Sequence, residues 1–98
     1  MIAEFSIVPL TGEESLSPYV AMILKEVKQS GLDYVLTPMG TIVEGETDEV
    51  FDLIKKCHKL MKKHANRVLT RISIDDRGDD LKRMDRKVKS VLEKLDDK

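Results

Sequence analysis

The stretch that decides the fold runs from Tyr34 to Gly45 and reads Y-V-L-T-P-M-G-T-I-V-E-G. It contains two short apolar runs joined at Pro38-Met39-Gly40, a pattern that is typical of a β-hairpin. Three polar side chains, Thr37, Thr41 and Glu44, interrupt segments that would otherwise be buried. The hairpin therefore either faces water at these positions or holds a ligand there.

The segments on both sides of the hairpin alternate between strand and helix periodicity. The expected elements are a strand from Ile2 to Leu10, a helix capped by Ser17 and closed by Gly31, hairpin strands at Tyr34–Pro38 and Thr41–Gly45, a helix capped by Thr47 and ending near His64, a strand from Arg67 to Asp75, and a last helix over 81–96. This order, β-α-β-β-α-β plus a terminal helix, predicts a single α+β domain over 1–98 with a ferredoxin-like fold. Its antiparallel sheet would have strand order 4-1-3-2, with two helices on one face.

The composition narrows the classes of function. The 98 residues include 17 basic and 18 acidic side chains, and this balance argues against an electrostatic grip on nucleic acid. No apolar run approaches the roughly 20 residues of a membrane-spanning helix. The N-terminal residues do not resemble an export signal, and the lone Cys57 cannot form an internal disulfide, so we expect a cytoplasmic protein.

Two helices cover one side of a four-stranded sheet, so the other side is left over. Alternation along the strands places these apolar side chains under the helices: Phe5, Ile7, Leu36, Val43, Val68, Ile72 and Ile74. It sends these polar side chains to the opposite face: Glu4, Ser6, Thr37, Glu44, Arg71 and Ser73. The apolar stripe of the 81–96 helix is a second surface without an obvious partner inside the monomer. Contacts with other subunits would cover both surfaces, so we expect a dimer or a dimer of dimers.

The sequence offers little for catalysis. It has no His-Glu pair at metal-binding spacing, no CxxC motif and no glycine-rich phosphate loop, so neither a metal nor a cofactor is predicted. Cys57 falls on the apolar stripe of its helix and is expected in the core, while His58 is expected at the surface. The acidic run Asp75–Asp80 lacks the spacing of an EF-hand loop, and a solvated turn explains it better than a cation site. RNA binding is not expected, because the open face has no aromatic side chains on its central strands.

The hairpin with its P-M-G-T-x-x-E-G segment, the first strand with Ser6, the helix start Ser17-Pro18-Tyr19-Val20 and the strand R-V-L-T-R-I-S-I-D-D-R resemble the YkoF-like thiamine-binding proteins. The resemblance covers nearly the whole chain and implies a ferredoxin-like fold, assembly into dimers or tetramers, and binding of thiamine or its hydroxymethylpyrimidine portion without chemistry. The candidate ligand-binding residues are Ser6, Thr37, Met39, Gly40, Thr41, Glu44 and Arg71.

Within this set, the resemblance and the side-chain chemistry suggest separate roles. Ser6, Thr37 and Thr41 would orient a pyrimidine by hydrogen bonds, and Glu44 would neutralise a thiazolium cation. Two alternatives stay open: an interaction module whose polar sheet face is only a subunit interface, and a phosphate or divalent-ion sensor that uses Arg71 and the acidic turn.

Overall fold

The computed structural model describes residues 1–12, 16–77 and 83–96. Its elements are β1 (Ile2–Pro9), α1 (Ser17–Gln29), β2 (Asp33–Thr37), β3 (Gly40–Glu44), α2 (Thr47–Lys62), β4 (Val68–Asp75) and α3 (Arg83–Asp96). The predicted succession of strands and helices is confirmed.

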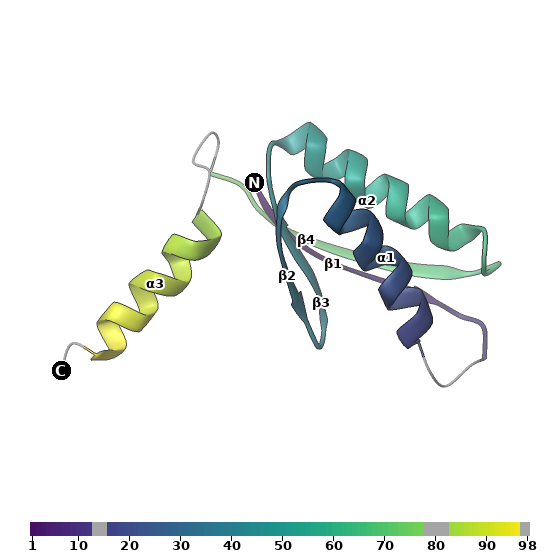
Figure 1. Ribbon diagram of the computed structural model, residues 1–98, viewed down its shortest axis with the longest axis horizontal. Helices are drawn as coiled ribbons and strands as arrows, with labels where there is room; N and C mark the ends of the chain where they lie inside the picture. Colours follow the sequence, from purple (N-terminus) through teal and green to yellow (C-terminus); the bar gives the residue numbers. More distant parts are fainter. Residues whose placement is uncertain (13–15, 78–82, 97–98) are drawn as a thin grey trace.

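The four strands form one antiparallel sheet with the order β2-β3-β1-β4. This is the predicted order read from the opposite edge. Helices α1 and α2 lie side by side on one face of the sheet, and α3 projects away from the sheet and its two helices (Figure 1). We call the side under α1 and α2 the helix side and the other the open face.

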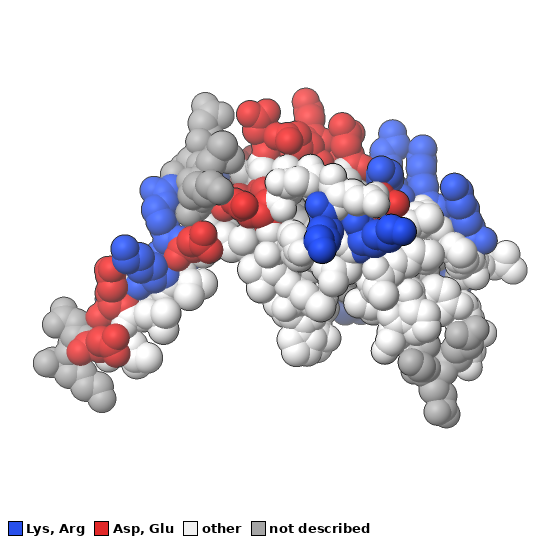
Figure 2. All heavy atoms as spheres, viewed as in Figure 1, with Lys and Arg blue, Asp and Glu red and all other residues white. Residues whose placement is uncertain are grey.

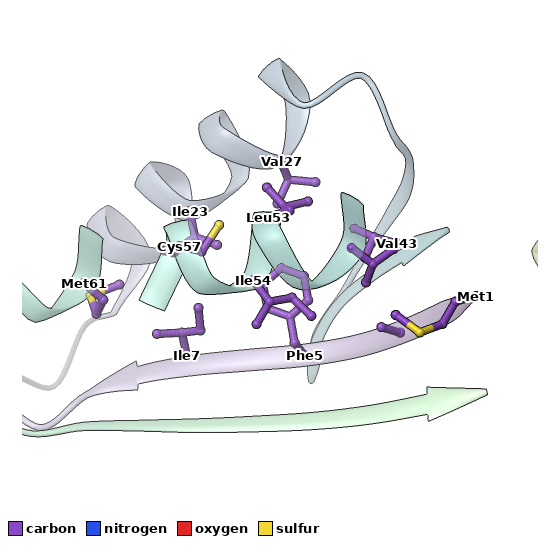
Figure 3. Packing of buried hydrophobic residues seen from close by; sticks show 12 residues of the cluster. Met1, Phe5, Ile7, Ile23, Val27, Val43, Leu53, Ile54, Cys57 and Met61 are labelled. Atoms are coloured by element: carbon purple, nitrogen blue, oxygen red, sulfur yellow. The ribbon is translucent and has the colours of Figure 1, made fainter. Parts of the chain in front are cut away.

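The core lies between the central strands and these two helices (Figure 3). Phe5 and Ile7 project from β1 toward α2, where Ile54 and Cys57 are buried with them. Ala3 of β1 belongs to the same buried cluster. This arrangement follows from the i, i+3, i+4 spacing of the α2 stripe, which turns one side of the helix toward the strands. The prediction that Cys57 is a core residue is confirmed.

Three side chains assigned to the covered side are less covered than expected. Leu36, Ile72 and Ile74 do face the helix side, but 50%, 43% and 43% of their surfaces are exposed. They belong to the two outer strands, β2 and β4, whereas the helices pack mainly on the central strands. Alternation gives the direction of a side chain correctly, but it does not say how far two helices reach across a sheet.

Two predicted helix caps are wrong by one residue. The residue that precedes α1 is Leu16 and the one that precedes α2 is Glu46, and neither helix has a capping hydrogen bond from a side chain. Ser17 and Thr47 are instead the first helical residues. Pro18 lies in the first turn of α1, as predicted, where its missing N–H costs nothing. Gly31 follows α1 with φ +77°, the left-handed conformation that closes many helices.

Candidate functional site

The hairpin turn is held by the hydroxyl group of Thr37. Thr37 Oγ1 donates to the carbonyl oxygen of Gly40 at 2.8 Å and accepts from the backbone N–H groups of Met39 at 3.2 Å and Gly40 at 3.1 Å. One donated and two accepted bonds use the full capacity of a hydroxyl group. Thr37 therefore shapes the turn, and its hydroxyl has nothing left to offer a ligand in this conformation.

Gly40 allows the hairpin to lie close to β1. A Cβ atom at this position would stand 2.8 Å from the carbonyl oxygen of Phe5, closer than real Cβ contacts come. The start of β3 is therefore fixed by two features: the turn that Thr37 shapes, and the close approach of Gly40 to β1.

The first strand continues beyond the point where β3 begins. The pairing of β1 with β3 stops at Phe5 opposite Thr41, while β1 pairs with β4 as far as Pro9. Met1 and Gly45 exchange both backbone hydrogen bonds, at 2.8 and 3.1 Å, so the odd-numbered residues of β1 direct their N–H and C=O groups toward β3. Ile7 is the next such residue after Phe5, and no described strand lies opposite it.

The open backbone edge of Ile7 borders a small pocket of about 200 Å³, here called the helix-side pocket. It lies where β1, the hairpin tip and the start of α1 meet, and Figure 2 shows a notch there with uncharged side chains on both sides. The described residues that line it are Phe5, Ser6, Ile7, Val8, Pro9, Leu16, Tyr19, Val20, Ile23, Leu36, Thr37, Pro38, Met39, Gly40 and Thr41. None of them is charged. Such a pocket suits a neutral, flat, mostly apolar group.

Thr41 supplies a hydroxyl group to the helix-side pocket. The register places it on the helix side, opposite Phe5 and Leu36, and only 6% of its surface is exposed. A hydroxyl group beside an open backbone edge is suited to direct a polar ligand, because it can both donate and accept a hydrogen bond.

Two other candidate residues meet on the open face. Ser6 and Arg71 are direct cross-strand neighbours, and with Glu4, Met39 and Ser73 they line a shallow hollow of about 280 Å³, here called the open-face hollow. The prediction that Ser6 and Arg71 lie on the same, uncovered face of the sheet is confirmed. Met39 and Ser6 border both this hollow and the helix-side pocket.

Glu44 lies apart from both cavities. It is 5% exposed, and its Oε2 accepts a hydrogen bond from the backbone N–H of Met84 at 3.3 Å, in the first turn of α3. A carboxylate is favourable there, because the start of a helix carries unpaired N–H groups and partial positive charge. The structure thus brings Ser6, Thr37, Met39, Gly40 and Thr41 to one pocket, and places Glu44 beneath α3 and Arg71 on the open face.

The two side chains weighed for catalysis have structural surroundings. Burial raises the pKa of the Cys57 thiol from 9.0 to about 11, and the nearby Glu26 carboxylate acts in the same direction. His58, expected at the surface, is half-buried, and its Nδ1 lies 2.6 Å from the hydroxyl oxygen of Thr70. This bond ties α2 to β4, because His58 is on the sheet-facing flank of the helix.

The acidic run Asp75–Asp80 lies partly outside the described residues, from position 78 on. Within the described ranges, no three His, Cys, Asp or Glu side chains gather as a metal site. None of the helices described combines the length and the apolarity that crossing a lipid bilayer takes.

Comparison with known proteins places the chain in a family. The family model described as thiamine-binding protein matches residues 3–92. The chain belongs to the thiamine-binding protein family. The matched segment contains both cavities and most of α3.

Several relatives support this membership. A UPF0045 protein of Staphylococcus xylosus is 41% identical over 98% of this chain and 95% of its own length. The UPF0045 protein YqgV of Bacillus subtilis is 37% identical over 96% of each chain. The crystal structure of a hypothetical protein from Methanocaldococcus jannaschii is similar to this fold with a TM-score of 0.84, at 33% identity over 92% of this chain and 93% of that one.

Proposed function

We propose that this protein binds the aminopyrimidine part of thiamine, or free hydroxymethylpyrimidine, in the helix-side pocket. The observation that carries the proposal is the open backbone edge of Ile7 inside an uncharged pocket of about 200 Å³. Membership in the thiamine-binding protein family supports the choice of ligand.

The proposed ligand matches the groups that the pocket offers. An aminopyrimidine carries an amino donor next to a ring-nitrogen acceptor, and the peptide edge of Ile7 presents an acceptor and a donor side by side. The ring would form hydrogen bonds with this edge as a neighbouring strand would if β3 were long enough to lie opposite Ile7. The Thr41 hydroxyl could then bond a second ring nitrogen, while Tyr19 and Ile23 enclose the flat apolar faces.

Because the helix-side pocket has an uncharged lining, it should accept the neutral part of thiamine and not its charged parts. None of the described lining residues is a carboxylate that would stabilise a thiazolium cation, and none is a cation that would bind a phosphate. Burying either charge without a partner is expensive. The thiazolium ring and any phosphate groups should therefore stay at the mouth of the pocket, and Glu44 should not contact the cation.

We also propose binding without chemistry. The buried Cys57 thiol has a raised pKa, so at neutral pH it stays protonated and is a poor nucleophile. The pocket contributes hydroxyl groups and a backbone edge, but its described lining includes no base to activate them.

Self-association in the cytoplasm completes the proposal. Val88, Val91, Leu92 and Leu95 of α3 are each more than half exposed. Figure 2 shows the charged side chains along the outer side of α3 and uncharged ones toward the sheet. A groove of about 500 Å³ lies between this apolar side and Val35 of β2. Such a surface is suited to contact other copies of the chain in a dimer or tetramer.

Isothermal titration calorimetry with hydroxymethylpyrimidine, thiamine and thiamine phosphates tests the proposal. We expect hydroxymethylpyrimidine to bind at least as tightly as thiamine, and thiamine phosphates to bind no tighter than thiamine. Thr41→Val keeps the shape of the side chain but removes one hydrogen bond, so affinity should fall roughly tenfold. Thr47→Val, an exposed change at the start of α2, is the matched control and should bind normally.

Two results would contradict the proposal. If none of these compounds binds to the folded protein, the ligand assignment is wrong, and the result favours the alternative of an interaction module. If thiamine phosphates bind far more tightly and Arg71→Ala abolishes that binding, the open-face hollow is the site and the anion-sensor alternative is correct.

A further inference from the structure

The outer edge of β4 is long, and no strand among the described residues pairs with it. β4 spans eight residues and ends the sheet on one side. The backbone N–H of Leu10 donates to the carbonyl oxygen of Arg67, so the odd-numbered residues of this segment bond to β1. The even-numbered residues Val68, Thr70, Ile72 and Ile74 therefore direct their N–H and C=O groups outward.

This edge has few of the features that protect strand edges from pairing. Natural edges are usually short or bulged, or they carry proline or several charges. Here Ile72 and Ile74 are 43% exposed on the helix side, and Arg71 is the one charged side chain between Val68 and Ile74. An edge of this kind is suited to receive another strand.

A second copy of β4 is complementary to this edge in one register. Two copies of β4 can pair antiparallel about a twofold axis, with backbone hydrogen bonds between their even-numbered residues. With the axis at Ser73, Ile72 lies opposite the partner's Ile74, and Arg71 lies opposite the partner's Asp75. Both contacts occur twice, and both join groups that favour each other.

The neighbouring registers lack this match. With the axis at Arg71, two arginines face each other, and like charges directly opposite are destabilising. With the axis at Ile72, Arg71 faces a serine and Leu69 faces a carboxylate.

In the register with the axis at Ser73, Asp75 can still accept a hydrogen bond from the partner's Arg71. It already accepts one from Lys87 at 2.6 Å, but a carboxylate can accept from more than one donor.

We propose that β4 pairs with β4 of a second copy about a twofold axis at Ser73, which joins two four-stranded sheets into one continuous sheet. This inference rests on the self-association proposed above and adds a second contact surface to the one on α3. The helix-side pocket lies away from this edge, so ligand binding does not depend on the pairing.

Charge reversal tests the register. Arg71→Asp places two carboxylates opposite each other, and Asp75→Arg places two guanidinium groups there. In sedimentation equilibrium, we expect each variant alone to dissociate at roughly tenfold higher concentration than the wild type, because both symmetric contacts become repulsive. An equimolar mixture of the two variants restores opposite charges at both contacts and should assemble as the wild type does.

Lys25→Asp is the matched control, because it makes the same change of charge at an exposed position of α1, away from β4 and from the α3 groove. Circular dichroism confirms that each variant is folded. If the wild type assembles and the reversed variants assemble equally well, the β4 pairing is wrong while self-association stands. If the wild type is monomeric at every concentration, both proposals fail.

Discussion

Replacing Gly40 by alanine should loosen the hairpin from β1. The added Cβ would lie 2.8 Å from the carbonyl oxygen of Phe5 and 3.4 Å from its carbonyl carbon. Both are backbone atoms of the central strand, so they cannot rotate away, and β3 must shift instead. The substitution thus perturbs the junction on which the helix-side pocket depends.

Overpacking a close contact costs about 1 to 3 kcal/mol. Alanine also restricts the unfolded chain, which offsets roughly 0.4 to 1 kcal/mol. The net loss in the free energy of unfolding should be about 1 to 2 kcal/mol, which lowers Tm by roughly 5 to 15 °C in a domain of this size.

Urea denaturation and calorimetry measure the effect, with Gly45→Ala as the matched control. A Cβ at Gly45 would come within 2.9 Å of Leu32, but only of the movable end of that side chain. Its loss of stability should stay under about 1 kcal/mol. A Gly40→Ala protein that is as stable as the Gly45→Ala protein would refute the reasoning.

Three further changes have defined outcomes. Thr37→Val removes the three hydrogen bonds of the turn and should cost about 1 to 3 kcal/mol in urea unfolding, whereas Thr37→Ser should restore most of it; equal stabilities would contradict this role. Glu44→Ala should speed hydrogen exchange in the first turn of α3 and leave pyrimidine affinity unchanged, so lost affinity would return Glu44 to the site. The pKa of Cys57 is raised from 9.0 to about 11, so its stabilising effect is complete below about pH 9 and is lost as the pH rises toward 11. Cys57→Ala should lack that part of the decline, and identical pH profiles for the two proteins would contradict it.

The sequence predicts the parts of the fold that depend on periodicity. The hairpin and the helix stripes follow from the spacing of apolar residues and from the turn at Pro38-Met39. The open-face positions of Ser6 and Arg71 follow from alternation. These features are local, so one stretch of chain is enough to reveal each of them, whereas the strand order follows from the succession of all the elements.

The helix-side pocket could not be predicted in the same way. Its polar edge is the peptide group of Ile7, which carries no signature in the side-chain sequence. It becomes available only because β1 is longer than its partner β3, and that depends on the register between distant segments. The same register places Thr41 on the helix side. The position of Glu44 under α3 depends on how the terminal helix packs, which the hairpin sequence does not encode.

The most direct test of the account is amide hydrogen exchange at Ile7, followed by nuclear magnetic resonance with and without hydroxymethylpyrimidine. The amide of Val8 faces β4 and should be protected in both states. We predict that the Ile7 amide exchanges rapidly in the free protein, and that the ligand slows its exchange and shifts its resonance. Binding that leaves Ile7 unchanged and shifts Arg71 and Ser73 instead would contradict the account.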